Sequence, residues 1–398
     1  MSAVDLSARA VARSLLSRLR GGQLTVVEGS REERFGEPSD IDARLEVVEP
    51  QLWRKAVGGG GVGFGEAYVD GLWDSDDIVS VLRILARNLD RLNRLLRNPL
   101  TRLRALGNVF VRSTPSAADD RSNIQAHYDL GDDFFQLFLD PTMAYSCALW
   151  ERPGMTLEEA QVAKFDAIAQ RIGLNRDSDV LEIGTGWGGF AAYVASEYGS
   201  RVTTTTISEQ QYDHARALVA RQGLDDRVTV LREHYRDLRG SFSHVVSIEM
   251  IEAVDWRLYD EYFAKIARLL RRDGVAAIQA ITVPDGEFDS SKRWREFIRR
   301  YVFPGSCLPS VAAMVDTTKR VTDLSVLDLR DIGRHYVTTL RCWREALDSR
   351  LDAARSLGLS EPFLRMWRYY FAYCEAAFAE RRISDVQLVL ARPGWRPA

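Results

Sequence analysis

Residues 179–190 have the sequence DVLEIGTGWGGF, and this stretch decides the fold. Its first residues are apolar enough for a buried strand, and its last residues suit the start of a helix. Between them lie the glycines Gly184, Gly186, Gly188 and Gly189. A glycine-rich turn between a strand and a helix lets the backbone pass close to a ligand. The stretch therefore predicts the ligand-binding turn of an α/β domain.

Strand-like and helix-like segments alternate around this turn. Strands are predicted over 179–184, 201–207, 228–231, 244–250 and 275–281, with helices that begin at Gly188 and Ser208 or cover 258–270. This βαβα alternation predicts a parallel, doubly wound sheet of the α/β class, whose ligand lies at the carboxyl ends of the strands. The stretch VQLVLAR near the end of the chain is consistent with a closing strand of the same sheet.

The chain is long enough for more than this sheet. Its 398 residues exceed the roughly 100–200 of a usual single domain, so a second lobe is expected. Residues 1–122 predict a mostly helical lobe with one strand-like segment, TVVEG, and a tight loop at the glycine run 58–61. Residues 123–398 then form the sheet domain.

One helix of the N-terminal lobe is strongly basic. Residues 81–112 contain eight arginines and one aspartate, and leucines recur at three- and four-residue steps. Such a helix suits an anionic lipid surface. An ordinary helix with packed leucines and solvated arginines explains the pattern equally well, so both interpretations stay open.

Composition excludes several classes of protein. A net charge of −3 and the absence of a basic, aromatic-interleaved groove argue against a nucleic-acid partner. No run approaches the ~18 apolar residues of a spanning helix. The four cysteines are far apart, which indicates neither a disulfide framework nor a metal site. We expect a cytoplasmic protein.

The glycine turn alone leaves the cofactor open, because Gly184, Gly186 and Gly189 also satisfy GxGxxG. A nicotinamide cofactor would need an acid at the tip of the second strand, and RVTTTTIS has none. The acid is instead Glu182, inside the first strand. This arrangement favours a class I S-adenosylmethionine methyltransferase.

Longer motifs make the resemblance specific. In chain order, NIQAHYDLGDDFF, FLDPTMAYSCALW, LEIGTGWGGFA, SIEMIEAV and HYVTTLRCW resemble the cyclopropane fatty acyl phospholipid synthase and mycolic acid cyclopropane synthase family. The resemblance covers about residue 123 to the end. It implies a class I methyltransferase fold and transfer of a methyl or methylene group from S-adenosylmethionine to a cis double bond of an unsaturated phospholipid acyl chain.

The resemblance also implies the cofactor contacts. Gln211 would hydrogen-bond the ribose and Tyr235 would cover the adenine. An ordinary strand residue remains the alternative for Thr206. The full expected set is Tyr145, Ser146, Glu182, Gly184, Thr185, Gly186, Trp187, Gly188, Gly189, Thr206, Gln211, Tyr235 and Arg236.

At the reacting end, the resemblance implies that a bound bicarbonate acts as the base. Backbone at the Cys147 loop and at Ile248 would hold it, together with Glu252 and Tyr336. Gln279 stands where the family has a histidine, and Ala253 replaces another histidine. An amide donates a hydrogen bond but cannot relay a proton as imidazole does, so the proton exit is in question.

Three further residues stay open. Glu249, where the family more often has a small residue, is either an additional site carboxylate or a surface acid. His127 either lines the active site or caps a helix. Cys374 matches a cysteine labelled as the family's active-site residue, although a packing role is favoured because methyl transfer to an alkene needs no thiolate.

The product and partners depend on the fate of the carbocation. Loss of a proton from the added methyl gives a cyclopropane, and a prior hydride shift gives a methylene-branched chain. The IEAV and QAIT stretches resemble the methyltransferase of 10-methyl fatty acid synthesis, which implies a flavin- or nicotinamide-dependent reductase as partner. The resemblance is compatible with a homodimer, peripheral on the inner face of the membrane. A methyltransferase of soluble small molecules and a non-catalytic lipid-binding relative are the alternatives.

Overall fold

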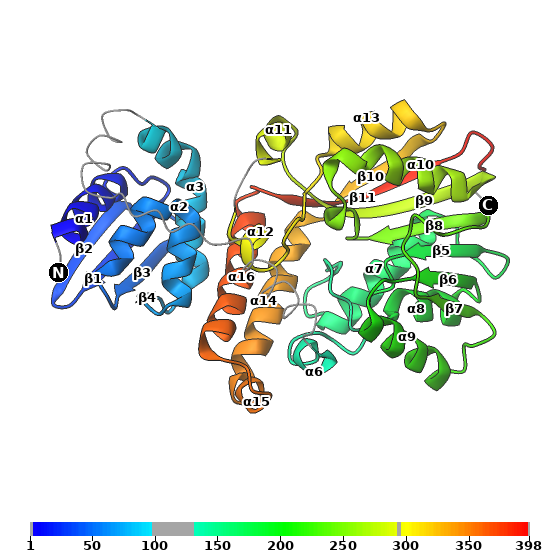
Figure 1. Cartoon of the computed structure of the whole chain (residues 1–398), viewed down its shortest axis with the longest axis horizontal. Helices are drawn as coiled ribbons and strands as arrows, with labels where there is room; N and C mark the ends of the chain where they lie inside the picture. The colour runs from blue at the N-terminus through cyan, green and yellow to red at the C-terminus, as the bar shows by residue number, and fades with distance from the viewer. Residues whose placement is uncertain (1–2, 98–130, 293–295, 397–398) are drawn as a thin grey trace. The chain divides into compact units, whose positions relative to one another are not determined.

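The computed structural model of the chain describes residues 3–97, 131–292 and 296–396. Contacts divide the chain into two compact units (Figure 1). The first unit comprises Met1–Asp129, Arg295–Pro304 and Trp343–Arg382, and the second comprises Leu130–Trp294, Gly305–Cys342 and Ile383–Ala398. The predicted division at residue 122 differs from this one, because the first unit also includes two segments from late in the chain.

The first unit contains a four-stranded sheet of order β2-β1-β3-β4. Its strands are β1 (Gly22–Glu28), β2 (Arg31–Glu37), β3 (Asp42–Val47) and β4 (Trp73–Asp74). Its helices are α1 (Ala3–Leu16), α2 (Gln51–Val69), α3 (Ile78–Arg97), α12 (Phe297–Tyr301), α15 (Leu351–Ser356) and α16 (Glu361–Ala379). This unit therefore contains more strand than the mostly helical lobe that we expected.

Two local expectations for this unit need correction. The glycine run 58–61 is not a loop but lies inside α2, where Gly60 has φ 57° and kinks the helix. α16 packs on α2 and α3, so a segment expected to belong to the sheet domain completes the core of the first unit. The long-range pairing was invisible in local sequence patterns.

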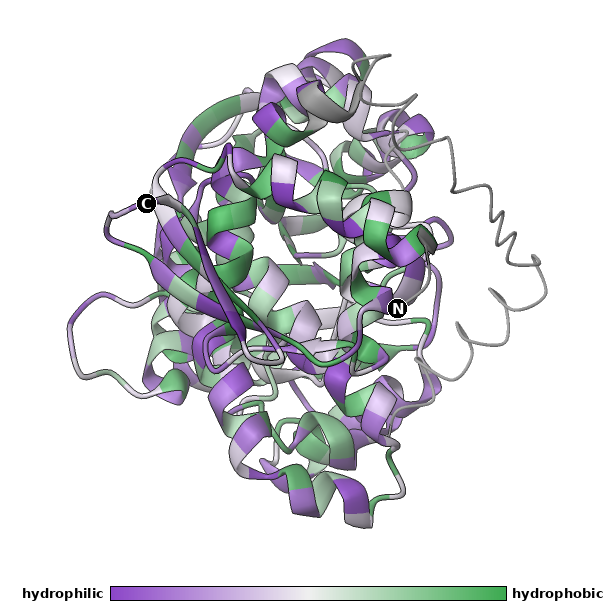
Figure 2. Ribbon diagram, turned by 90° about the vertical axis from the view of Figure 1, so that its left-hand side faces the viewer, coloured by the Kyte–Doolittle hydropathy of each residue, from purple (hydrophilic) through white to green (hydrophobic). Residues whose placement is uncertain are grey.

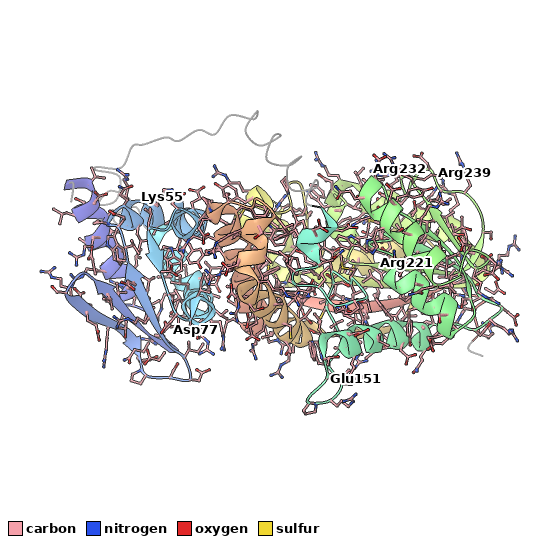
Figure 3. All side chains as sticks on the ribbon, turned by 90° about the horizontal axis from the view of Figure 1, so that it is seen from below. Lys55, Asp77, Glu151, Arg221, Arg232 and Arg239 are labelled. Carbon is pink, nitrogen blue, oxygen red and sulfur yellow. The ribbon has the colours of Figure 1, made fainter. Side chains whose placement is uncertain are left out.

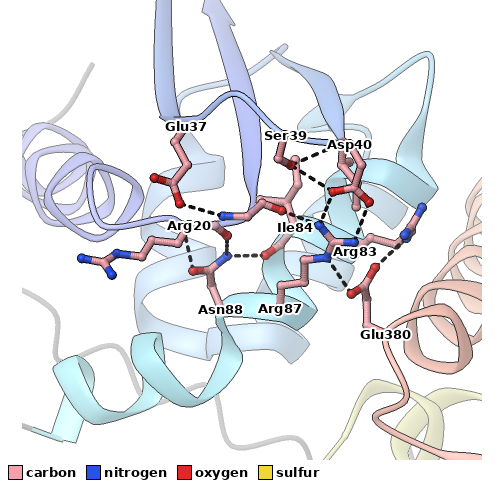
Figure 4. Close-up of polar contacts among 11 residues, drawn as sticks. Arg20, Glu37, Ser39, Asp40, Arg83, Ile84, Arg87, Asn88 and Glu380 are labelled. Atoms are coloured by element: carbon pink, nitrogen blue, oxygen red, sulfur yellow. Dashed lines mark hydrogen bonds and ion pairs between the residues drawn. The ribbon is translucent and has the colours of Figure 1, made fainter.

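Arginines of α3 make ion pairs within the first unit (Figure 4). Arg83 Nε and Arg87 Nε each lie 2.7 Å from a carboxylate oxygen of Glu380. The guanidinium of Arg87 also donates to both carboxylate oxygens of Asp40. Part of the basic face of α3 is therefore used in internal contacts.

The second unit contains a seven-stranded sheet of order β10-β11-β9-β8-β5-β6-β7. Its strands are β5 (Asp179–Ile183), β6 (Arg201–Thr205), β7 (Val228–Leu231), β8 (Phe242–Ile248), β9 (Leu270–Thr282), β10 (Ser325–Asp331) and β11 (Ser384–Ala391). The pairs among β5 to β9 are parallel, whereas β11 and β10 are antiparallel to their neighbours. The doubly wound α/β prediction and the closing strand are confirmed, and β10 was not predicted.

Both faces of this sheet are covered. Leu181 belongs to a buried cluster with Phe263 of α10, and the adjacent Val180 belongs to another with Phe165 of α7. Successive strand residues point to opposite faces, so β5 is packed on both sides. The helices of the unit are α6 (Asp132–Phe135), α7 (Leu157–Arg171), α8 (Gly189–Glu197), α9 (Glu209–Arg221), α10 (Tyr259–Leu269), α11 (Phe288–Ser291) and α13 (Val311–Val321).

One further helix, α14 (Gly333–Ser349), has residues in both units. Hydrophobic and hydrophilic residues alternate along many helices (Figure 2), as expected of helices with one packed face. Charged residues such as Glu151, Arg221 and Arg232 project outward from the second unit (Figure 3). Within the described ranges, no helix combines the length and apolar character needed to cross a bilayer.

Candidate active site

The glycine turn follows the carboxyl end of β5 and leaves space on one side. Gly184, Gly186 and Gly188 all have positive φ, at 100°, 52° and 92°. A Cβ at Gly184 would lie 3.2 Å from Met250, and one at Gly188 would lie 3.0 Å from Ala215. A Cβ at Gly186 would meet no atom within 4 Å. Gly186 thus faces open space, as expected for a backbone that passes close to a cofactor.

The expected ribose contacts lie together at the next strand end. Thr206 follows β6, and its hydroxyl donates to Gln211 Oε1 at 2.8 Å. Gln211 lies in the first turn of α9, whose N-cap is Ser208. The side-chain amide of Gln211 is thereby held at the carboxyl end of β6, which fits the predicted cofactor contact.

Glu182 has a more internal position than a ligand contact requires. It is 2% exposed and accepts a hydrogen bond from Thr204 Oγ1 at 2.6 Å. Burial raises the pKa of Glu182 to about 8. The same Thr204 hydroxyl lies 2.7 Å from Thr185 Oγ1 in the turn. Glu182 therefore supports the turn from inside the sheet.

Aromatic residues surround the turn. Trp187 donates through Nε1 to Asp132 Oδ1 at 2.8 Å, and His214 Nδ1 lies 2.6 Å from the other carboxylate oxygen of Asp132. The ring of Phe135 contacts both Trp187 and Tyr145, with centroids 4.6 and 5.6 Å away. Trp187 and Tyr145, far apart in sequence, are thus on one aromatic surface.

Tyr235 and Arg236 are oriented toward protein groups. Tyr235 is 7% exposed and packs edge-on against Tyr262 in the sheet core. Arg236 pairs with Glu261 at 3.0 Å. A role of these two residues in covering the adenine remains a prediction.

At the end of β8, Glu249 turns its carboxylate into a ring of donors. Its Oε1 accepts from the backbone N–H of Cys147 at 2.7 Å and from Gln279 Nε2 at 2.8 Å. Its Oε2 accepts from the hydroxyl of Tyr336 at 2.7 Å. We call these three donors, with Glu249, the carboxylate cradle. Three hydrogen bonds of this kind fix both oxygens of the carboxylate in place.

The backbone of Glu249 is strained. Its φ is 48°, in the left-handed region that non-glycine residues seldom adopt. Its N–H donates to the carbonyl oxygen of Gln279 at 2.8 Å, which ties the turn to β9. Such strain persists only where surrounding contacts enforce it, and it is concentrated at functional sites.

Two more carboxyl groups lie near the cradle. Asp385 is fully buried and accepts from Gln279 Nε2 at 3.1 Å. Burial, and then the nearby Glu249 carboxylate, holds the pKa of Asp385 well above its usual range. The same two causes raise the pKa of Glu252 to about 8. Of the three carboxyl groups, Glu249 is the one held by the three donors of the cradle.

Segments on both sides hold the cradle rigid. The helix α14 supplies Tyr336 and also Thr339, whose Oγ1 accepts from the backbone of Ala148 at 3.2 Å. From α7, the fully buried Lys164 donates to Ser146 Oγ at 2.6 Å. Burial lowers the pKa of Lys164 to about 8. The loop that carries Ser146 and Cys147 is thus fixed from two helices.

Comparison with known proteins identifies the family. The chain matches the model of mycolic acid cyclopropane synthetase over residues 116–388. The chain belongs to this family. It is 39% identical over 360 residues to the tuberculostearic acid methyltransferase UfaA1 of Mycobacterium tuberculosis. This alignment covers 88% of this chain and 83% of that protein. It is 35% identical to the cyclopropane-fatty-acyl-phospholipid synthase of Escherichia coli over 353 residues, or 88% of each chain.

Solved structures agree with this assignment. The mycolic acid cyclopropane synthase CmaA1, in complex with SAH and CTAB, superposes with a TM-score of 0.63 at 32% identity. The match covers 68% of this chain and 97% of that one. The predicted resemblance, the class I methyltransferase fold and the S-adenosylmethionine-dependent methyltransferase activity are confirmed.

The cradle uses donors that the family resemblance assigned to a bicarbonate site. The Cys147 backbone and Tyr336 were expected to hold a separate bicarbonate, with Glu252 beside them and Gln279 in place of the family's histidine. In the structure, the Cys147 N–H, the Tyr336 hydroxyl and the Gln279 amide donate to Glu249 instead. Glu252 Oε1 accepts from the backbone N–H of Ile281 at 2.5 Å. Glu249 itself has a left-handed backbone. Its own carboxylate therefore reaches the donors that were expected to hold the anion.

The remaining predicted site residues lie elsewhere or are inert. Burial raises the pKa of the Cys147 thiol well above its usual value, so Cys147 contributes its backbone and not a thiolate. Cys374 lies on α16 in the first unit, where burial likewise raises the pKa of its thiol. A packing role fits this position. His127 lies outside the described residues.

Sequence analysis missed several buried polar residues beside the site. Lys164, Asp385 and Gln387 are polar side chains within segments that are otherwise packed in the core. Buried polar groups need partners, so an aspartate and a glutamine inside the apolar closing strand were a usable signal. Their partners could not be named without the sheet register.

Proposed function

We propose that this methyltransferase alkylates the cis double bond of an unsaturated phospholipid acyl chain and that Glu249 is the base that removes the departing proton. The product is a cyclopropane or a methylene-branched chain. The carboxylate cradle carries the proposal, because its three donors hold a side-chain carboxylate at the carboxyl ends of the strands.

The relatives support the class of substrate. One is named for tuberculostearic acid and another for fatty acyl phospholipids, and this chain aligns with most of the length of both. The two names refer to different products, so together they do not choose between a cyclopropane and a branched chain for this enzyme. We infer the acyl-chain substrate from these two relatives together.

The glycine turn and the residues beside it would hold S-adenosylmethionine. When bound, this cofactor supplies an electrophilic methyl group on a sulfonium. The open side of Gly186 and the amide of Gln211 fit the group, and Trp187, next to Gly186, shares one aromatic surface with Tyr145.

Glu249 has the chemistry that the second half of the reaction needs. After the alkene has formed its bond to the methyl carbon, the acyl chain carries a carbocation, which must lose a proton. A carboxylate oxygen of Glu249 accepts that proton, and the electron pair of the broken C–H bond closes the ring or forms the new double bond. The positioned base is worth roughly 100-fold or more in rate.

Glu249 explains why the histidines of the family are dispensable here. A bound bicarbonate needs side chains that hold it and share its proton. A carboxylate attached to the chain is held covalently, and an amide at 279 is a sufficient donor. We therefore propose that this enzyme does not need bicarbonate.

We also propose that the enzyme docks at an anionic membrane. If its product is methylene-branched, a reductase would act on that product next. Arg91 and Arg94 extend the basic face of α3 beyond the arginines that pair with Glu380. Phospholipid acyl chains are available only at such a surface.

The test compares two isosteric variants, Glu249→Gln and Glu252→Gln. Purified proteins are incubated with unsaturated phospholipid vesicles, and the acyl products are measured by gas chromatography. We expect Glu249→Gln to lose ~100-fold or more of the activity, and Glu252→Gln to retain much more. Equal activity in wild type and Glu249→Gln would refute Glu249 as the base.

A further inference from the structure

Gln279 of the cradle is one link in a buried chain of hydrogen bonds. Its Oε1 accepts from Gln387 Nε2 at 3.1 Å, and Gln387 Oε1 accepts from Arg171 Nη1 at 2.8 Å. Gln279 and Gln387 are directly opposite each other on β9 and β11. They are 1% and 2% exposed, so neither amide can exchange its partners for water. The chain runs from the end of α7 to the Glu249 carboxylate.

This chain has a direction, and Arg171 imposes it. A guanidinium only donates hydrogen bonds, so Gln387 must turn its oxygen toward Arg171 and its nitrogen toward Gln279. Gln279 must then present its oxygen to Gln387 and its nitrogen to Glu249 and Asp385. A reversed Gln279 would place a carbonyl oxygen against the Glu249 carboxylate and remove a donor from the cradle.

Arg171 is itself fixed by an ion pair. Its Nη2 lies 2.5 Å from Asp328 Oδ2, and the Asp328 side chain is 54% exposed. The guanidinium is therefore anchored at its outer end and faces the buried amides at its inner end. No described contact of Arg171 or Gln387 reaches Glu249 directly, so any effect on catalysis must pass through Gln279.

We propose that Arg171 and Gln387 are positioning residues, which hold the Gln279 amide in the orientation that donates to the Glu249 carboxylate. This inference rests on the proposed function of Glu249. The other groups that face Glu249 are Tyr336 from α14, Asp385 from β11, the Cys147 backbone and, through the field, Lys164 and Glu252. The variants below leave all of these unchanged.

The first test compares Gln387→Glu with Gln387→Met. A glutamate accepts from Arg171 and also from Gln279, so it forces the Gln279 amide to reverse. A methionine of similar size removes the link to Arg171 without forcing a reversal, so only Glu249 and Asp385 then orient the Gln279 amide. Losing a donor to the charged form disfavours that form, so in Gln387→Glu the acid-side pH of half-maximal kcat should rise by about one unit.

The expected sizes separate the two variants. At neutral pH, kcat of Gln387→Glu should fall about 10-fold with KM for S-adenosylmethionine within about twofold of wild type. Gln387→Met should shift the pH profile in the same direction but by less than Gln387→Glu, and should lose about threefold in kcat. Circular dichroism and thermal melts establish that each protein is folded.

A charge-swapped variant tests the direction of the hydrogen-bond chain at its outer end, the ion pair of Arg171 and Asp328. Arg171→Glu with Asp328→Arg retains an ion pair at this place, but the residue at 171 becomes an acceptor. Gln387 and then Gln279 must reverse, and the pH profile should move in the same direction as in Gln387→Glu. This variant keeps the inference testable if a buried glutamate at 387 prevents folding.

Two results would overturn the inference. One is the same pH profile in wild type and in the folded reversing variants, and the other is the same change in Gln387→Met as in Gln387→Glu. Glu249→Gln is measured in parallel. If Glu249→Gln is inactive while the reversing variants behave like wild type, only the positioning role of Arg171 and Gln387 is refuted. If it is fully active, the proposed function fails as well.

Discussion

At the scale of single residues, Glu249 shows how a strained backbone serves chemistry. A non-glycine residue with φ 48° costs roughly 1–3 kcal/mol, and three donors to its carboxylate compensate for that cost. The sequence showed an acid at position 249, where the family more often has a small residue. It left a site carboxylate and a surface acid as equal alternatives for Glu249. The positive φ decides between them, because it turns the side chain toward the donors.

Replacing this residue by glycine should separate strain from catalysis. In Glu249→Gly, relief of the left-handed strain offsets the lost hydrogen bonds, so the thermal midpoint should stay close to that of wild type. Activity should be lost and then partly restored by added bicarbonate, because the donors of Cys147, Tyr336 and Gln279 are left facing an empty position. Activity without any anion would show that the base lies elsewhere.

The glycine turn gives a prediction about the cofactor. In Gly186→Val, the side chain enters the open side of the turn, so calorimetric titration should detect no S-adenosylmethionine binding while the protein remains folded. The control is Gly173→Val, because Gly173 also has positive φ and no atom within 4 Å of its Cβ position. Gly173→Val should suffer similar backbone strain and keep the affinity. Unchanged affinity in Gly186→Val contradicts the assignment of the turn.

Glu252 gives a prediction about stability and pH. Its pKa rises from 4.5 to about 8 on folding, so between these values the folded protein holds a proton that the unfolded chain has released. The contribution of Glu252 to stability therefore falls as pH rises through this window. Glu252→Gln mimics the protonated acid, and its free energy of unfolding should exceed that of wild type more at pH 8 than at pH 5. Urea unfolding measures the difference, and one that is constant with pH contradicts burial of the neutral acid.

At the scale of elements, most strands of the second unit could be predicted from the sequence. The strand β10 and the helical setting of the glycine run 58–61 could not. Apolar runs between glycines and polar turns identify β5 to β9 because a parallel sheet packed on both faces needs continuous apolar strands. β10 has the sequence SVLDLRD and exposed side chains along its length, so no burial pattern indicated it. The run 58–61 was assigned to a loop by composition, whereas helical turns on both sides of it form α2, with a kink at Gly60.

The arginines of α3 divide into two groups with different expected effects. Arg83 and Arg87 pair with Glu380, so replacing them with glutamine should lower the thermal midpoint. Replacing Arg91, Arg94 and Arg97 with glutamine should instead weaken sedimentation with anionic vesicles, since each basic residue contributes about 1 kcal/mol near such a surface. The effect should be largest at low salt. Equal binding to neutral and anionic vesicles, unaffected by the changes, would exclude docking through this helix.

At the scale of the whole molecule, local patterns could predict the sheet and the family but not the division of the chain. The first unit takes α16 from late in the sequence because its aromatic face packs on α2 and α3, a long-range choice that no local signal carries. The same limit explains the site. Glycines, Glu249 and Gln279 were visible in the sequence, but Asp385, Gln387 and Arg171 acquire meaning only when the sheet places them together.

The most direct test of the account is transfer of a labelled carbon. Wild type and Glu249→Gln are incubated with S-adenosylmethionine that carries ¹³C in its methyl group and with vesicles of cis-unsaturated phospholipid, without added bicarbonate. Mass spectrometry of the released fatty acids should find one labelled carbon in the acyl product of wild type, and ~100-fold less product from Glu249→Gln. Unlabelled acyl chains from wild type, or equal labelled product from both proteins, would contradict the account.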